Sequence, residues 1–230
     1  MDLKKLREEV LEANLEIVRR GLVLFTFGNA SGFDAESKRV VIKPSGVPYE
    51  ELTPDHMVVS DLNGKVVKGA LRPSSDLPTH LALYRAFPVI GGIVHTHSRY
   101  ATAWAQACTD LPCLGTTHAD YLRGPIPVTS HMPDEEILSE YELNTGNAIV
   151  RRFEDLDPLE TPAVLVAGHA PFCWGISPAD AAHTAVMVEE LAHMAFVTFS
   201  INPEAMPLSD TLRDKHYLRK HGSAAYYGQK

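Results

Sequence analysis

The residues of this sequence best suited to chemistry are histidines with metal-ligand spacing. His95 and His97 follow the apolar run 91–94, which is typical of a buried β-strand. Residues two apart on a strand point to the same face, so both imidazoles can reach one ion. A third histidine, His169, ends the apolar run 163–167. Imidazole suits zinc, and a catalytic zinc site has three protein ligands and one open position. The pattern therefore predicts a metal centre, with ordinary strand histidines as the alternative.

Three short turns have the composition of an anion-binding cradle. Two follow predicted strands and one precedes a predicted helix; glycine lets backbone N–H groups approach a ligand, and serine hydroxyls add donors. Lys43 supplies a positive charge beside one of them. Taken singly, each is equally an ordinary turn or helix cap. The turns are Gly28-Asn29, Ser45-Gly46 and Ser74-Ser75.

Three further residues admit more than one role. Asp76 follows the two serines, and three roles are open to it: a helix cap, a fourth metal contact, or a carboxylate that transfers protons near the metal. Asp120 lies in a polar, loop-like stretch, and its pattern alone favours a turn residue. Tyr227 lies in the C-terminal tail, where tyrosines more often pack or fray than catalyse.

The elements that position these residues alternate between strands and helices. Apolar spacing predicts a helix from residue 3 to Gly21, a strand over 22–27 that enters the turn 28–32, and a strand over 40–42. Asn63-Gly64 predicts a hairpin, so the sheet is at least partly antiparallel. Ser98 is expected to cap a helix that ends near residue 107. Further helices are expected over 76–87, 133–153, 177–199 and 212–220. We expect a single α/β domain over residues 1–230, with helices packed on a mixed sheet.

Composition restricts the classes of partner. The formal net charge is −8, whereas nucleic-acid and anionic-membrane binders need a basic surface, so neither partner is expected. The N-terminus opens into an amphipathic helix without an apolar secretion segment, and no uninterrupted apolar stretch is as long as a membrane span. Three cysteines without a C-x-x-C pair fit reduced thiols, so we expect a cytoplasmic protein.

Six segments in one order carry a family resemblance. They are residues 28–31, 42–46, 73–76, 92–98, 115–121 and 215–222. With them the chain resembles the class II aldolase/epimerase superfamily over essentially its whole length. The segments around Asn29, Lys43 and His95 are shared with sugar-phosphate aldolases, whereas the segment around Asp120 and the C-terminal tail select the pentulose-phosphate 4-epimerases.

The resemblance implies a class II aldolase-like α/β fold, with a mainly antiparallel central sheet between helices. It implies a homotetramer with active sites between neighbouring subunits, and a pentulose phosphate substrate whose phosphate lies on the cradle turns. It also implies a Zn²⁺ ion, or Mn²⁺ or another divalent metal, with Asp76 beside it. The implied metal ligands are His95, His97 and His169. Relatives usually carry glycine where this chain has Ala170, directly after the third ligand.

The chemistry implied by the resemblance is cleavage and re-formation of a carbon–carbon bond, in a pathway such as arabinose catabolism. C4 of a ketopentose phosphate bears no acidic proton, so inversion requires breaking the C3–C4 bond, turning the aldehyde and adding it back. The metal stabilises the charge left on the three-carbon fragment, and two proton-transfer groups serve the opposite faces of the aldehyde. The resemblance assigns these roles to Asp120 and to Tyr227 of a neighbouring subunit, which reverses the interpretation of both residues from pattern alone.

Two alternatives remain open on the sequence. One is an aldolase that releases its products, or an epimerase of another pentulose phosphate. The other is a non-catalytic binding module with this fold, which predicts loss of metal ligands, whereas all three histidines are present.

Overall fold

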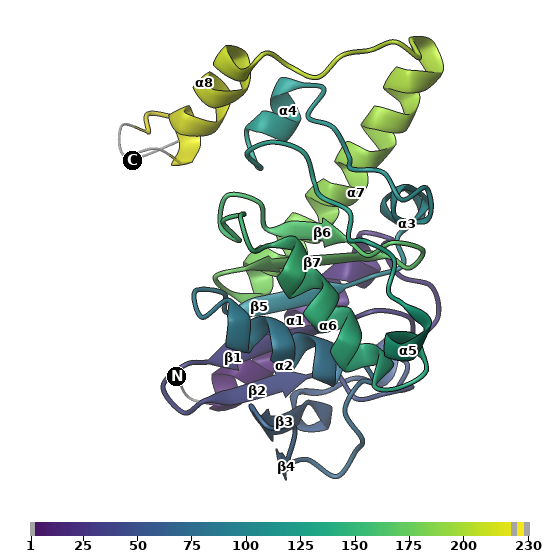
Figure 1. Cartoon of the computed structure of the whole chain (residues 1–230). Coiled ribbons are helices and arrows are strands. Elements are labelled where there is room, and N and C mark those ends of the chain that lie inside the picture. Colours follow the sequence, from purple (N-terminus) through teal and green to yellow (C-terminus); the bar gives the residue numbers. More distant parts are fainter. Residues whose placement is uncertain (1–2, 222–224, 228–230) are drawn as a thin grey trace.

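An antiparallel sheet forms the centre of the computed structural model, which describes residues 3–221 and 225–227 (Figure 1). Within these residues, seven strands pair in the order β4-β3-β2-β1-β5-β7-β6, and every neighbouring pair is antiparallel. The mainly antiparallel sheet implied by the family resemblance is therefore confirmed, whereas the mixed sheet expected from the pattern of elements is wrong. The strands are β1 (Asn29–Asp34), β2 (Arg39–Ile42), β3 (Val58–Asp61), β4 (Val66–Lys68), β5 (Gly92–His95), β6 (Ala163–Leu165) and β7 (Pro171–Gly175).

Helices cover both faces of this sheet. Figure 1 shows α2 and α6 in front of it, and α1 and the first part of α7 behind it. Side chains alternate along each strand, so Ile93 joins the core under α2 and α6, whereas Val94 joins the core under α1 and α7. The helices are α1 (Leu3–Arg19), α2 (Leu77–Ala86), α3 (Arg99–Gln106), α4 (Thr116–Ala119), α5 (Asp134–Ile137), α6 (Tyr141–Arg152), α7 (Pro178–Ile201) and α8 (Asp210–His221), with 3₁₀ turns at Tyr49–Glu51 and Pro54–His56.

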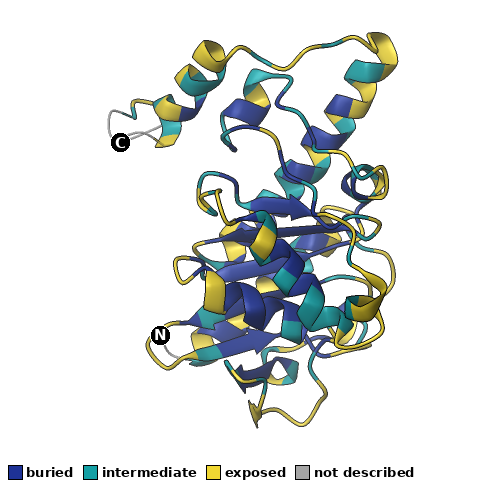
Figure 2. Ribbon diagram, in the orientation of Figure 1, coloured by how far each residue is buried: buried dark blue, intermediate teal, exposed yellow. Residues whose placement is uncertain are grey.

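An arm projects from this body. The second half of α7, together with α4 and α8, lies beyond the sheet in Figure 1, and Figure 2 shows many exposed residues along it. Phe196 is 56% exposed and Ile201 is 80% exposed. By length and composition, α7 could cross a membrane, but the core helix of a globular protein passes the same test. Its buried side chains are mostly alanines, which pack on the sheet and on α1.

The predicted strand over 22–27 is wrong. Residues 22–24 have no regular structure, the chain turns at Phe25 (φ 53°), and the strand begins later, at Asn29. The predicted turn 28–32 is therefore largely the strand β1. Small residues form it because space is short: a Cβ on Gly32 would lie 2.7 Å from Leu6 Cδ1. Ser31 is buried and bonds to the His80 and Tyr84 side chains at 2.7 and 2.8 Å.

Two helix predictions need correction in detail. The helix expected over 133–153 is two helices, α5 and α6, and the break lies at 138–140 rather than at Gly146. Gly146 lies inside α6. A glycine is needed there because α2 packs so closely that a Cβ would lie 2.6 Å from Ala82 Cβ. Ser98 is the N-cap residue of α3, but its side chain makes no capping hydrogen bond.

The remaining elements follow the prediction closely. The hairpin around Gly64, the strand at 40–42, and the helices α1, α2, α7 and α8 are confirmed. Ser177 caps α7 by accepting a hydrogen bond from the Asp180 N–H (3.1 Å). In the tail, residues 222–224 and 228–230, which include Gly222 and Gly228, lie outside the described residues.

Candidate metal centre and phosphate cradle

Three histidines converge at one end of the central strands. The ligand atoms of His95, His97 and His169 lie within 4.8 Å of one another, and the Nε2 atoms of His95 and His97 are 3.2 Å apart. His95 is the last residue of β5, His97 lies in the connection to α3, and His169 lies in the turn between β6 and β7. β5 and β7 pair directly, with His95 opposite Phe172, so the sheet itself brings the two histidine segments together.

Hydrogen bonding and stacking fix the ring of His95. Its Nδ1 donates to the Pro171 carbonyl oxygen at 2.9 Å, because a carbonyl can only accept. The lone pair of Nε2 therefore faces His97, as in metal sites where the second ring nitrogen is held by a backbone carbonyl. Phe172 stacks on the same ring, with centroids 4.1 Å apart.

All three imidazoles are neutral at neutral pH. Burial lowers the pKa of His95, and burial together with His95 lowers the pKa of His97. Burial, with His95 and His97 nearby, lowers the pKa of His169 to about 4. The buried Nδ1 of His169 has no hydrogen-bond partner among the described residues. Neutral imidazoles aimed at one point, one with an unpaired buried nitrogen, fit a divalent cation of the zinc type.

The predicted anion cradle surrounds this histidine cluster. A cavity of about 340 Å³ is lined by the three histidines and by every residue predicted for the cradle. Gly28 has φ +94°, and a Cβ there would lie 2.9 Å from the His95 carbonyl oxygen, so the backbone requires glycine. The predicted cradle residues that line the cavity are Gly28, Asn29, Lys43, Ser45, Gly46, Ser74 and Ser75.

Lys43 is the positive charge of the cradle. Its side chain is buried, its Nζ donates to the Pro44 carbonyl oxygen at 3.3 Å, and it lies 4.7 Å from the centroid of the Tyr49 ring. Burial lowers the pKa of Lys43 to about 8. The Tyr49 hydroxyl donates to the Gly28 carbonyl oxygen at 2.8 Å. The tyrosine that lies beside the Lys43 ammonium is therefore also bonded to the turn at Gly28.

Asp76 lines the same cavity but does not belong to the group of ligand atoms within 4.8 Å. Its Oδ2 accepts a hydrogen bond from Asn29 Nδ2 at 2.6 Å. Burial acts to raise the pKa of Asp76, but the nearby His95 and His80 and the bond from Asn29 outweigh it, and the pKa is lowered. Asp76 is therefore an ionised carboxylate beside the histidines. It is also the N-cap residue of α2, without a side-chain capping bond.

Five residues of the cavity wall were not among the predicted site residues: Thr26, Phe27, Pro44, Tyr141 and Glu142. Tyr141 begins α6, and its ring lies 6.2 Å from that of His169. Phe27 is 57% exposed, with its ring 6.3 Å from that of His97. Tyr141 and Glu142 belong to no motif, because α6 is brought to the cavity by its packing on α2.

Asp120 and Tyr227 lie together on the arm, and neither lines the cavity. Asp120 accepts hydrogen bonds from Arg219 Nη2 (2.6 Å) and from His216 Nδ1 (3.0 Å). Burial acts to raise the pKa of Asp120, but these two partners and Lys220 outweigh it and lower the pKa. The Arg219 guanidinium lies 4.7 Å from the centroid of the Tyr227 ring. A single chain thus pairs Asp120 with the tail but does not bring either residue to the histidines.

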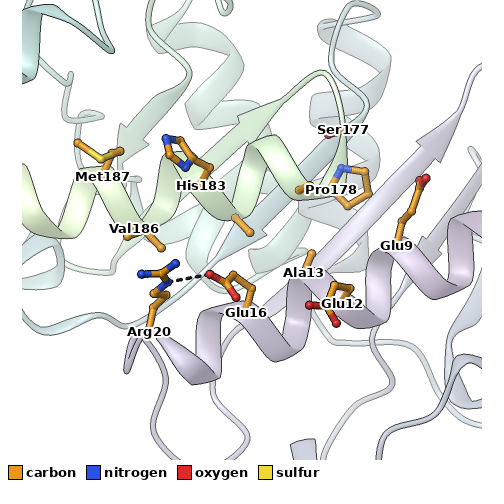
Figure 3. Close-up of a pocket in the computed structure, with 12 residues that line it drawn as sticks. Glu9, Glu12, Ala13, Glu16, Arg20, Ser177, Pro178, His183, Val186 and Met187 are labelled. Atoms are coloured by element: carbon orange, nitrogen blue, oxygen red, sulfur yellow. Dashed lines mark hydrogen bonds and ion pairs between the residues drawn. The ribbon is translucent and has the colours of Figure 1, made fainter. Parts of the chain in front are cut away.

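A larger hollow lies elsewhere, between α1 and the start of α7 (Figure 3). Its volume is about 620 Å³, and Ala13, Pro178 and Val186 contribute apolar surface to it. Glu16 in this wall is bound to Arg20 at 2.7 Å. The metal-ligand cluster is not part of this hollow, so the smaller cavity is the candidate active site.

Comparison with known proteins places the chain in a family. Residues 8–196 match the class II aldolase and adducin N-terminal domain, and the chain belongs to this family. Proteins described as L-ribulose-5-phosphate 4-epimerase UlaF, from Salmonella paratyphi B (strain ATCC BAA-1250 / SPB7) and from Salmonella typhi, are 54% identical over 228 residues. That is 99% of this chain and 100% of each relative.

Solved structures agree with this assignment. An L-fuculose 1-phosphate aldolase has a TM-score of 0.78 and 27% identity, covering 92% of this chain and 94% of that protein. YgbL from Klebsiella pneumoniae, a putative aldolase/epimerase/decarboxylase, has a TM-score of 0.72 and 24% identity over 94% of this chain and 99% of that one. The fold class and the family expected from the sequence are confirmed.

Proposed function

We propose that this protein is a divalent-metal-dependent epimerase that interconverts L-ribulose 5-phosphate and D-xylulose 5-phosphate. The observation that carries the proposal is the single cavity that holds both the three-histidine cluster and the glycine–serine–lysine cradle. The full-length relatives named L-ribulose-5-phosphate 4-epimerase support the choice of substrate. In this proposal residues 1–230 form one class II aldolase/epimerase domain that acts in the cytoplasm without a nucleic-acid or membrane partner, in a pentose pathway such as arabinose catabolism.

His95, His97 and His169 would hold the metal, with Asp76 beside it. A bound Zn²⁺, or Mn²⁺ in its place, supplies Lewis-acid stabilisation for negative charge that develops on the sugar oxygens during C3–C4 cleavage. Asp76 is ionised and fixed by Asn29, so it can complete the coordination sphere or accept a hydrogen bond at the metal. Ala170 is buried, and its carbonyl oxygen closes the turn that carries the third ligand by accepting a hydrogen bond from the Val166 N–H at 3.0 Å.

The cradle would hold the phosphate throughout the reaction. The donors around this cavity would be backbone N–H groups and hydroxyls. The N–H groups are those of Gly28 and Gly46, where φ is positive, and the hydroxyls are those of Ser45, Ser74 and Ser75. The Lys43 ammonium adds the charge. An anchored phosphate keeps the two-carbon aldehyde in the site after the C3–C4 bond breaks, and rotation of the aldehyde then presents its other face for re-addition. Asn29 completes this set and links the cradle to Asp76.

Asp120 and Tyr227 would transfer the protons of the C4 hydroxyl, one on each face of the aldehyde. Within one chain both lie on the arm, so they must reach the cavity of another subunit. This requirement supports a homotetramer with active sites at subunit interfaces. Exposed apolar side chains also favour self-association: Phe25 beside the cavity is 85% exposed, and Met206 on the arm is 81% exposed.

Incubation of the purified protein with L-ribulose 5-phosphate tests the proposal. D-xylulose 5-phosphate should form, with one divalent metal per chain, and the His97→Asn variant should lose metal and product together. Net accumulation of glycolaldehyde phosphate would instead indicate an aldolase, in line with the likeness to the L-fuculose 1-phosphate aldolase. A protein that lacks both metal and turnover would indicate a binding module.

A further inference from the structure

The first turn of α3 is capped by a residue from another helix. The side chain of Ser98, at the N-cap position, makes no capping bond, and its buried Oγ has no partner among the described residues. The carboxylate of Glu189, in α7, takes over this role. It accepts hydrogen bonds from the Tyr100 N–H at 2.9 and 3.2 Å and from the Ala101 N–H at 2.9 Å. A carboxylate at a helix N-terminus satisfies orphan N–H groups and opposes the positive end of the helix dipole.

α3 is attached at both ends to segments that carry histidines of the metal cluster. It begins at Arg99, two residues after His97, so its first turn fixes one end of the connection that carries this histidine. Near its other end, the Ala105 carbonyl oxygen accepts a hydrogen bond from the Gly168 N–H at 3.0 Å. Gly168 directly precedes His169. A shift of α3 would therefore displace the connection that carries His97 relative to His95, and it would strain the His169 turn, which β6 and β7 also hold.

Among the described residues, the ring of His97 has no hydrogen bond to a group outside the histidine cluster, and its ring contacts are with His95, His169 and Phe27. The polar contact described for it joins its Nε2 to His95 Nε2, and both of these are ligand atoms. His95, by comparison, is oriented by the Pro171 carbonyl and by stacking on Phe172. The orientation of His97 therefore depends on the backbone between β5 and α3, and hence on the position of α3 against α7.

α7 holds α3 through hydrogen bonds and ring contacts, which include those of Tyr100 with Phe196 and of Trp104 with Phe199. Besides the Glu189 cap, Trp104 Nε1 donates to the Ala192 carbonyl oxygen at 3.1 Å, and Tyr100 stacks on His193 with centroids 4.0 Å apart. Glu189 is the charged member, and it acts at the end of α3 nearest the metal cluster. We propose that Glu189 is a positioning residue for the metal centre. It fixes the position of α3, and through α3 it orients His97 and the turn that carries His169. This inference rests on the metal-dependent function proposed above.

The test compares three variants of the full-length protein. Glu189→Ala removes the cap, whereas Glu189→Gln keeps one carbonyl oxygen that can accept one of the two N–H groups. Glu190→Gln, an exposed neighbour on the same helix, makes the same change of charge away from α3. Zinc affinity is measured by chelator competition well below the melting temperature, and the visible spectrum of the Co²⁺-substituted protein reports ligand geometry.

We expect about tenfold weaker zinc binding in Glu189→Ala, as for other residues that orient metal ligands, with a smaller loss in Glu189→Gln and none in Glu190→Gln. The Co²⁺ spectrum should change in the same order. If Glu189→Ala does not fold, Glu189→Gln alone decides. Lower melting temperatures with wild-type zinc affinity and an unchanged Co²⁺ spectrum would refute the inference and leave the proposed function intact. A wild-type protein that binds no stoichiometric metal would refute the metal site itself, and the inference with it.

Discussion

The pH dependence of substrate binding is expected to follow Lys43. Its ammonium is buried beside the Tyr49 ring, and burial lowers its pKa to about 8. The charged form binds phosphate, so binding is intact below this pKa and is lost as the pH rises through it. With a pKa of about 8, roughly nine-tenths of the ammonium is protonated at pH 7 and roughly one-tenth at pH 9. We therefore expect kcat/KM for L-ribulose 5-phosphate to fall about tenfold over this range.

The assay follows kcat/KM from pH 6.5 to 9.5, because this quantity reports ionisations of the free enzyme. Two variants isolate the lysine. Lys43→Arg keeps a charge that does not titrate in this range, and Lys43→Met has none, so neither should show the decline near pH 8 even though both bind substrate less well. A flat wild-type profile between pH 7 and 9, or an unchanged decline in Lys43→Met, would refute the reasoning.

Three further variants separate the parts of the site. His97→Asn should lower metal content and activity together, as measured by elemental analysis and by turnover, because two ligands do not complete the site; full metal occupancy would contradict its role. Ser75→Ala should raise KM several-fold with little change in kcat, because phosphate binding persists through the reaction; a collapsed kcat at constant KM would contradict that role. Tyr227→Phe should lower epimerisation by about 10²-fold or more while zinc content and melting temperature stay constant; a near-normal rate would make the tail structural.

The convergence of the histidines and of the cradle residues on one cavity could be predicted because these residues lie at the ends of short strands or before the start of α2. The spacing of His95 and His97 predicted that both imidazoles reach one point, and they do, although only His95 lies in the strand and His97 follows it in the connection to α3. The sheet adds His169, since β7, which follows its turn, pairs with β5. Gly28 and Ser45 belong to turns with glycine and serine, and this composition predicted that they line one cavity, as they do.

Other features depend on packing that no local pattern carries. Tyr141 and Glu142 reach the cavity because α6 packs on α2, and their segment has no ligand motif. The strand β1 was missed because its residues are small or polar rather than apolar. Gly32 leaves room for the side chains of α1, and Ser31 makes buried hydrogen bonds. The cap of α3 was assigned to Ser98 because the nearest suitable residue is the natural choice in sequence. The actual cap, Glu189, lies about ninety residues away along the chain.

The placement of Asp120 and Tyr227 leads to the last prediction. Arg219 binds Asp120 and lies over the ring of Tyr227, so one arm carries both residues. If that arm serves a neighbour's cavity, equal mixing of His97→Asn and Tyr227→Phe subunits should leave about a quarter of the sites with both halves intact in a cyclic tetramer. Mixing Asp120→Asn with Tyr227→Phe should restore nothing, because every arm then carries one lesion. Activity is measured after the subunits are unfolded and refolded together, with each variant refolded alone as the control. Recovery in the second mixture would show that the two residues reach a site from different subunits, and no recovery in the first would refute the shared site.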